Sequence, residues 1–367
     1  MKSTISRKDL EGHPSLATIS NVQHLSSYSW IESPEPTIVV PGVPPKWQPP
    51  RREVVCPKDL GFHYIAQNAA CHPDSPMEPL FRALYQAGPS FDVRNIDVVT
   101  DRNNLRKLLS FVDPKSTRFG LEAFTIHAEL AVENTVIISR VEAQTHEIIG
   151  PEKFVGYDHE FEKAYTTCEI PNSTGHHRVI TYSFRGLSYV VRYEADAYVD
   201  AQESVPQVDS KSEDSITSIT SNIDELSLGS GSNLSVRKQG QIVPLDSTLE
   251  IKTRVAHKPI GVDDLWIFQT PKLVRAYYRY GPFGEAHVED VTDKVMAWER
   301  AQQPSLKKLA ALMTKLTEVV KGLCGSCVIR CCSEKTNELV SRRWMVDRCF
   351  HRTCITSGIK LRHVRPA

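Results

Sequence analysis

Residues 247–254 have the sequence S-T-L-E-I-K-T-R, and the interpretation of the whole chain depends on this stretch. Its branched and apolar residues predict a β-strand, in which successive side chains point to opposite faces. Glu250 and Lys252 therefore share one face, while Leu249 and Ile251 share the other. An acid and a base at this spacing are usually an ordinary ion pair on a solvated sheet face. A catalytic interpretation requires other carboxylates beside them.

A second predicted strand carries two more acids in the same arrangement. In Y-E-A-D-A-Y, residues 193–198, Glu194 and Asp196 are two positions apart and leave the same face. Two carboxylates held side by side raise each other's proton affinity unless a cation lies between them. If this strand neighbours the strand of Glu250 and Lys252, three carboxylates and a lysine meet. Such a set of oxygen ligands suits Mg²⁺ or Mn²⁺.

The surrounding sequence changes repeatedly between helical and strand patterns. Helical spacing of apolar residues predicts helices over 81–87 and 101–112, and alternation predicts strands over 124–132 and 135–143. Residues 179–199 predict a hairpin that turns at Arg185-Gly186. We therefore expect an α+β fold with a central mixed sheet flanked by helices.

Four short motifs follow one another along the chain, and a fifth segment lies downstream of them. They are T-D-R-N-N-L-R-K-L-L with Arg102, G-Y-D-H-E with Glu160, E-A-D with Glu194 and Asp196, E-I-K with Glu250 and Lys252, and finally W-I-F-Q with Gln269. In this order they resemble the DXO family of RNA decapping and 5′-end exonuclease enzymes, which is related to the PD-(D/E)XK nuclease fold. The resemblance covers roughly residues 95–285.

The resemblance implies a divalent-metal-dependent hydrolase of phosphodiester or pyrophosphate bonds at RNA 5′ ends, with Mg²⁺ or Mn²⁺ as cofactor and RNA as partner. It implies that Asp196 and Glu250 bind the metal directly and that Glu160 and Glu194 complete the ligand shell. Lys252 and Glu194 take catalytic roles, Lys252 by orienting the nucleophile and balancing charge. The remaining two motif residues, Arg102 and Gln269, would hold the phosphate or sugar of the substrate.

Composition divides the chain into segments. Residues 1–52 are rich in Ser and Pro and predict a disordered leader, and residues 53–300 predict the nuclease-like domain. Within that domain, residues 201–240 predict a disordered insertion, because 201–233 contain nine serines and only scattered aliphatic residues. Residues 301–367 predict a helix with leucines at helical spacing, followed by a basic, cysteine-containing extension packed on the domain.

Length and composition exclude several classes of protein. The chain has 367 residues, 40% of them hydrophobic, which suffices for a large core. No run of about 18 uncharged apolar residues occurs, and the N-terminus lacks the pattern of a signal peptide, so we expect neither membrane spanning nor secretion. Nine cysteines, an odd number, suit reduced thiols. The expected location is therefore nuclear or cytoplasmic.

Two other functions are compatible with parts of the sequence. A catalytically inactive nuclease-like fold could serve as a binding or scaffold protein, although such a protein has no need of four acids in one pocket. Adjacent acids at Asp263-Asp264 suggest a prenyl diphosphate synthase, which binds diphosphate through Mg²⁺ on two acidic motifs of an all-helical fold. Here the second motif is missing and the centre of the chain predicts strands, which disfavours that class.

Further candidate sites are better explained structurally. Cys324 and Cys327, with Cys349, His351 and Cys354 beyond them, have spacings compatible with a zinc site, but a strand with small buried cysteines is favoured and we expect no bound zinc. The pair His176-His177 could suggest a metal or proton-transfer role, but loop histidines before a strand are more often solvated, and we assign this pair no function. Glu162, two positions from Glu160 on a predicted helix, is expected to face away from the site as a surface residue.

Overall fold

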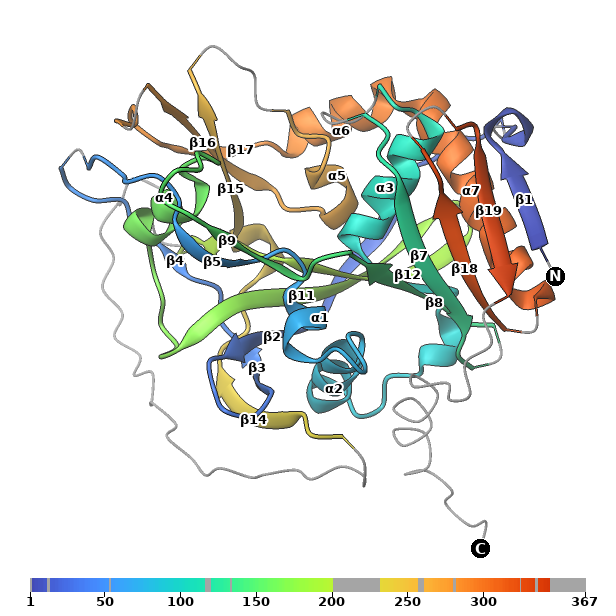
Figure 1. The fold of residues 1–367 in the computed structure, drawn as a ribbon, viewed down its shortest axis with the longest axis horizontal. Coiled ribbons are helices and arrows are strands. Elements are labelled where there is room, and N and C mark those ends of the chain that lie inside the picture. Colours follow the sequence, from blue (N-terminus) through green and yellow to red (C-terminus); the bar gives the residue numbers. More distant parts are fainter. Residues whose placement is uncertain are drawn as a thin grey trace, which may run out of the picture.

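The computed structural model describes the chain in ten segments, within which it has two β-sheets, a two-stranded ribbon and seven α-helices (Figure 1). The described residues are 2–11, 14–52, 54–115, 120–132, 134–200, 232–256, 261–279, 282–323, 325–333 and 336–343. Strands from the beginning, the middle and the end of the chain lie in the same large sheet.

The large sheet has eleven strands within the described residues and mixes parallel with antiparallel pairs. In spatial order they are β1 (Lys2–Ser6), β19 (Glu338–Arg343), β18 (Ser326–Cys331), β7 (Phe124–Leu130), β8 (Val136–Val141), β6 (Val98–Asp101), β12 (Leu187–Glu194), β11 (Ser173–Phe184), β2 (Ile19–Ile31), β3 (Thr37–Gly42) and β14 (Ser235–Gly240). The predicted hairpin is β11–β12, and its two turn residues, Arg185 and Gly186, have φ of 51° and 81°. Positive φ at both positions gives the turn the twist that adjacent strands require.

The small sheet lies beside the large one and contains the strand of the opening stretch. Its order is β10 (Thr166–Thr167), β4 (Lys46–Trp47), β13 (Ala197–Tyr198), β15 (Thr248–Val255), β16 (Lys272–Tyr278) and β17 (Val288–Asp290). The ribbon pairs β5 (Gly61–Tyr64) with β9 (His146–Ile149). Because β12 of the large sheet leads within two residues to β13 of the small sheet, the E-A-D motif lies at the junction of the two sheets.

Helices cover both faces of the large sheet. They are α1 (Gln67–Cys71), α2 (Glu78–Ala87), α3 (Arg102–Val112), α4 (Asp158–Tyr165), α5 (Leu265–Phe268), α6 (Thr292–Ala301) and α7 (Gln303–Gly322). Consecutive residues of β6 show the two faces: Val98 belongs to the core formed with α3 and α7, whereas Val99 contacts the cluster of α2. This confirms the predicted mixed sheet flanked by helices.

The expectation of a disordered leader over residues 1–52 needs correction. Strand β2 runs antiparallel to β11, and β3 pairs with β2, so this segment forms part of the large sheet. Tyr28 and Trp30 are buried, and they alternate with small serines in S-Y-S-W. Serine content suggested disorder, but small residues between aromatic ones suit a strand packed on both sides.

The end of the expected insertion also differs from the prediction. Residues 201–231 lie outside the described residues, whereas 235–240 form β14, which runs parallel to β3 at the edge of the large sheet. The sequence of this polar strand does not indicate which distant strand it pairs with. Its backbone N–H and C=O groups form hydrogen bonds with β3, and this pairing makes the segment a strand although its composition predicts disorder.

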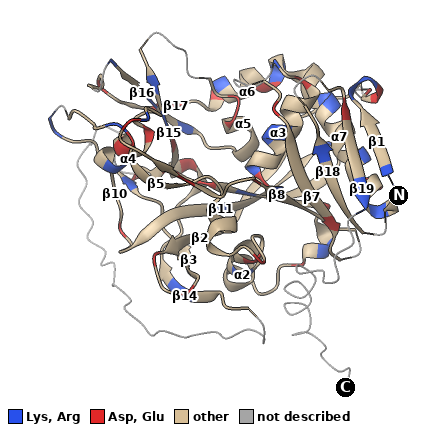
Figure 2. Cartoon of the chain, in the orientation of Figure 1, with Lys and Arg blue, Asp and Glu red and all other residues tan. Residues whose placement is uncertain are grey.

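The C-terminal segment contributes α7 and the strands β18 and β19. Basic side chains follow β1, β18, β19 and α7 on one side of the molecule (Figure 2). Cys327 and Cys331 are buried on β18, whereas Cys324, Cys349, His351 and Cys354 lie outside the described residues. No helix in the described part of the chain is both long and apolar enough to cross a membrane.

Candidate active site

The two acidic motifs meet where β13 pairs with β15. Ala197 lies opposite Leu249 in this antiparallel pair, and the preceding residue, Asp196, accepts a hydrogen bond from the backbone N–H of Ile251 at 2.7 Å. Leu249 and Ile251 are buried in the small sheet's core, as the alternation predicted. The structure therefore places the E-A-D and E-I-K motifs side by side, although they are separated by more than fifty residues in sequence.

Glu250 and Lys252 do not form an ion pair with each other on a solvated face. Glu250 is buried, and its Oε1 lies 3.6 Å from Nη1 of Arg102, while Nζ of Lys252 lies 3.5 Å from Oδ2 of Asp264. Each motif residue thus has a partner from another element, α3 for Glu250 and the residue before α5 for Lys252. The arrangement is a network of alternating charges rather than a single surface pair.

Burial and mutual repulsion raise the pKa values of the clustered carboxyl groups. The pKa of Asp196 lies well above its usual value because of burial and the nearby Glu250, despite the hydrogen bond from Ile251. Burial also raises the pKa of Glu250, although Arg102 and Lys252 oppose it. A cation among these groups would restore their charged forms.

Glu194 belongs to the same cluster but lies at its open side. It is exposed to the pocket described below, and partial removal from bulk water raises its pKa, while Arg102 and Arg140 lower it. Glu250 raises it further. The carboxyl group of Glu194 is thus exposed to solvent and lies near two arginines and the buried acids.

The structure corrects the expectation that Glu162 of α4 faces away from the site as a surface residue. Glu160 forms an ion pair with Lys163 at 2.6 Å, whereas Glu162 lies close enough to Asp196 and Glu194 for both to raise its pKa, after the larger effect of burial. Residues two apart on a helix lie about 200° apart around its axis, so both cannot face one site. The helix places Glu162 near the acid cluster, whereas the half-buried Glu160 lies beside Lys163 and Asp59.

The orientation of α4 explains which glutamate faces inward. Phe161 and Tyr165 are buried and stack on each other with ring centroids 3.9 Å apart, next to Trp47 in the small sheet's core. Glu162 follows Phe161 by one position and precedes Tyr165 by three, which puts it nearer to the inward side than Glu160. The F-E-K-A-Y pattern was therefore the sequence signal that could have identified Glu162.

Arg102 is the first residue of α3, and its guanidinium lies 5.0 Å from the ring centroid of Phe268. Burial lowers its pKa, but Glu250, Asp264 and other carboxylates outweigh this effect and raise it. Arg102 therefore carries a permanent positive charge at the edge of the acid cluster. This is the position at which an arginine can neutralise a phosphate.

A buried ion pair fixes the point at which α3 begins. Asp101, the residue before Arg102, accepts two hydrogen bonds from Arg192, at 2.6 Å from Nε and 3.1 Å from Nη2. Arg192 lies on β12, two residues before Glu194. A bidentate contact of this kind is strong and directional, so it sets the relative positions of Arg102 and Glu194. Neither Asp101 nor Arg192 was identified from the sequence.

The other predicted substrate-binding residue, Gln269, follows α5 and has a φ of 56°. Its side-chain amide donates a hydrogen bond to the backbone carbonyl of Trp266 at 2.5 Å. Gln269 does not line the pocket that contains Arg102 and Glu194. The structure therefore brings Arg102, but not Gln269, to that pocket.

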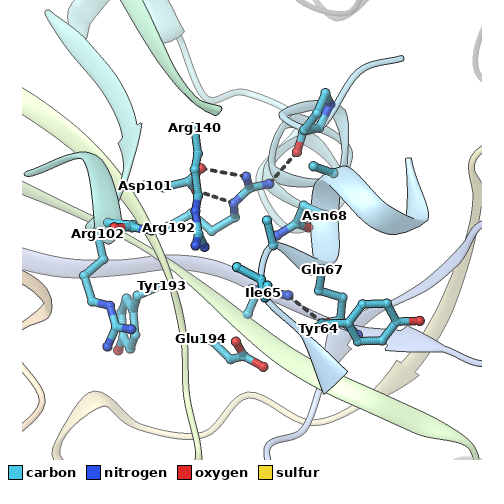
Figure 3. A pocket seen from close by; sticks show the side chains of 15 residues that line it. Tyr64, Ile65, Gln67, Asn68, Asp101, Arg102, Arg140, Arg192, Tyr193 and Glu194 are labelled. Carbon is cyan, nitrogen blue, oxygen red and sulfur yellow. Dashed lines mark hydrogen bonds and ion pairs between the residues drawn. The ribbon is translucent and has the colours of Figure 1, made fainter. Parts of the chain in front are cut away.

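A pocket that is open to solvent lies next to the acid cluster, with a cavity volume of about 80 Å³, and its lining side chains come from several elements (Figure 3). Arg102, Arg140 and Glu194 line it from one side, and the chain between β5 and α1 lines it from the other. Figure 3 also shows the dashed contacts between Arg192 and Asp101 at its wall. Its lining combines charged side chains with uncharged ones, so charged and polar groups of a ligand could both find partners there.

The histidine pair lies in β11, not in a loop, and His177 lines this pocket. Nδ1 of His176 lies 2.9 Å from Oγ of Ser29, and Nε2 of His177 lies 3.0 Å from Oε1 of Gln67. Burial holds the pKa of each imidazole well below its usual value. Both rings are therefore neutral at pH 7; His176 links β11 to β2, and His177 links β11 to α1.

Asp263 and Asp264 precede α5, and Asp264 lies among three cations. Burial raises its pKa, but Lys252, Arg102 and Arg106 outweigh this and lower it. Asp264 is therefore a charged partner of Lys252. The mixed sheets around it rule out the all-helical prenyl diphosphate synthase alternative.

The donor chemistry of the site fits a hard divalent cation, because Glu162, Glu194, Asp196 and Glu250 all supply carboxylate oxygens and their raised pKa values reflect uncompensated crowding. As the side chains stand, no three His, Cys, Asp or Glu residues in the described segments are placed closely enough to hold a metal ion. Asp196 is directed to a backbone N–H and Glu250 towards Arg102. Coordination would therefore require these side chains to turn.

Comparison with solved structures defines the class of fold. The chain resembles Rai1 of S. pombe in complex with 3′-FADP (11% identity, TM-score 0.59, covering 94% of this chain and 100% of that one). It also resembles Candida albicans Rai1 in complex with pU5 and Mn²⁺ (11% identity, TM-score 0.57, covering 99% and 100%) and K. lactis Dxo1 in complex with manganese (8% identity, TM-score 0.55, covering 94% and 98%). The chain thus has the fold of the Rai1 and Dxo1 structures, which confirms the predicted likeness to the DXO family.

A family model described as "Domain of unknown function (DUF8563)" matches residues 5–355, and the chain belongs to that family. No curated protein matches the sequence significantly. The family match begins in β1, in agreement with the structural role of residues formerly expected to be a leader.

Proposed function

We propose that this protein is a divalent-metal-dependent hydrolase that acts at the 5′ ends of RNA. The observation that carries the proposal is the pairing of β13 with β15, which sets Asp196 beside Glu250 with Arg102 and Lys252 at the edge of the same cluster. The shared fold adds support, because related structures were solved with Mn²⁺, with pU5 or with 3′-FADP.

In this proposal Asp196 and Glu250 bind the metal directly, and Glu194 and Glu162 complete the ligand shell, with Glu162 in the place first assigned to Glu160. A Mg²⁺ or Mn²⁺ ion bound there would polarise a phosphoryl oxygen and lower the pKa of a bound water. The protein's own part is to hold the phosphate with Arg102, in a pocket where the Asp101–Arg192 ion pair fixes the helix that carries it.

Lys252 is the second functional cation. Its Nζ is held 3.5 Å from Asp264, on the same strand face as Glu250. A lysine in this position stabilises negative charge that develops on the phosphoryl group, and Asp264 keeps its side chain extended towards the cluster. Glu194, which is open to the pocket, is the carboxylate best placed to accept a proton from an attacking water.

The direct test is hydrolysis of capped, triphosphorylated and monophosphorylated RNA by the full chain with Mg²⁺, Mn²⁺ or EDTA. We expect metal-dependent release of product from at least one substrate, and loss of that activity in Asp196→Asn with the fold retained by circular dichroism. Absence of metal binding by calorimetry, together with absence of turnover in every condition, would refute the proposal.

A binding or scaffold protein with a nuclease-like fold is the second candidate. The observation that favours it is the present separation of the carboxylates, since no three of them are arranged to hold a metal ion in the described segments. This candidate predicts RNA binding that does not change on addition of Mn²⁺ or EDTA. Calorimetric titration with Mn²⁺ separates the two, because only the enzyme requires the side chains to converge on a cation.

A further inference from the structure

The β5–β9 ribbon has one buried and one exposed face. Its register pairs Phe62 with Ile148 and His63 with Glu147. Alternation sends His63 and Ile149 inward, where both are buried, and the ring of His63 stacks on His159 of α4 with centroids 4.0 Å apart. The ribbon is therefore fixed on the helix that carries Glu162.

The opposite face forms an exposed surface that we name the ribbon platform, made of Phe62, Tyr64, His146 and Ile148. Phe62 is 52% exposed and Ile148 is 73% exposed in the structure. The Phe62 ring stacks on His146 at 5.0 Å between centroids and meets the edge of Tyr64 at 4.9 Å. Clustered exposed apolar groups of this kind mark interaction sites, because their exposure to water is unfavourable.

The ribbon platform is continuous with the candidate active site. Tyr64 belongs to the platform and also lines the pocket, as does the next residue, Ile65, opposite Arg102 and Glu194 (Figure 3). The pocket has a cavity volume of about 80 Å³ and is open to solvent, so it can hold only the end of a long ligand. A polymer held there by its 5′ end must therefore leave across the pocket's rim, part of which is Tyr64.

We propose that the ribbon platform binds single-stranded RNA that extends from the pocket, by stacking bases against Phe62 and its neighbours. This inference rests on the function proposed above. Bases stack on aromatic side chains irrespective of sequence, so this contact would add affinity for length without specifying sequence. A protein partner is disfavoured, because a stable protein interface takes roughly 20 or more residues from each side and the platform has four.

The test compares two strand lengths on the full chain. Fluorescence anisotropy would measure the affinity for 5′-monophosphorylated oligouridylates of two and ten nucleotides, with Ca²⁺ as an oxygen-binding cation. The readout is the ratio of the two affinities. We expect Phe62→Ala to lower this ratio about tenfold, as loss of one stacked base implies, Ile148→Ala to lower it less, and Phe62→Trp to preserve it.

The matched control is Ile242→Ala. Ile242 is also a large exposed apolar residue, 65% exposed, but it follows β14 and does not line the pocket. Its substitution should leave the ratio of affinities unchanged. Thermal melts of all variants would verify that each is folded, which the exposure of both Phe62 and Ile242 leads us to expect.

The outcomes separate this inference from the proposed function. If the wild-type chain prefers the longer strand and Phe62→Ala retains the full preference, the platform is refuted and the proposed function stands. Equal weakening of both lengths by Phe62→Ala would also refute it, since the residue would then support the pocket. If the wild-type chain binds neither strand, RNA is not the ligand and both proposals fail.

Discussion

Replacing Asp196 with Asn removes a charge from the acid cluster while keeping the shape of the side chain. Without metal, burial and Glu250 raise the pKa of Asp196 well above its usual value, so the folded protein retains this proton at pH values at which the unfolded chain has already released it. The free energy of unfolding therefore falls as the pH rises from the unfolded to the folded pKa of this carboxyl. The aspartate destabilises the metal-free protein at neutral pH.

The size of the effect follows from two opposing contributions. Each unit by which the pKa is raised corresponds to about 1.4 kcal/mol of destabilisation at a pH above both values. Asparagine still accepts the hydrogen bond from Ile251, but a neutral acceptor contributes about 1 kcal/mol less than a charged one. Since burial and two carboxylates act on Asp196, we expect Asp196→Asn to be more stable than the wild type by about 1 kcal/mol or more in EDTA at pH 7.

Chemical denaturation in EDTA and in Mn²⁺, at pH 5 and pH 8, measures this effect. In EDTA the advantage of Asp196→Asn should be larger at pH 8 than at pH 5, because the stability of the wild type falls as the pH rises towards the raised pKa of Asp196 in the folded protein. In Mn²⁺ the order should reverse, since the wild type gains binding free energy that the variant lacks. Equal stability of the two proteins in all four conditions would refute the assignment of Asp196 to a crowded metal site.

Three further substitutions test other parts of the site and fold. Lys252→Ala should abolish turnover but leave the Mn²⁺ affinity, measured by calorimetry, nearly unchanged, because the lysine is proposed to stabilise negative charge rather than bind the metal. A parallel loss of metal binding would contradict that role. Glu162→Gln should weaken Mn²⁺ binding about tenfold or more, whereas the matched variant Glu160→Gln, which breaks only the exposed pair with Lys163, should not; the opposite order would restore the first assignment. Trp30→Ala should cost about 3–5 kcal/mol in urea denaturation, because this side chain is buried in β2, while a cost near zero would be expected of a disordered leader.

The sequence by itself determined the features that depend on local periodicity. Glu250 and Lys252 leave one face of β15 because side chains alternate along any strand. The same rule does not apply to Glu194 and Asp196, because β12 ends at Glu194 and Asp196 lies in the link to β13. The hairpin turn at Arg185-Gly186 is equally local, since it depends on the φ angles that two adjacent residues adopt. The order of the motifs also sufficed to predict the class of fold.

Only the tertiary structure decided which of these residues meet. Strand β2 gains its hydrogen bonds from β11, whose partner residues lie more than a hundred positions away, so composition near residue 30 could not show that it folds. The approach of Glu162 to the acid cluster depends on how Phe161 packs α4 against the small sheet. Pairing partners distant in sequence and the rotation of a helix about its axis are set by the packing of the whole core, which no short window of sequence contains.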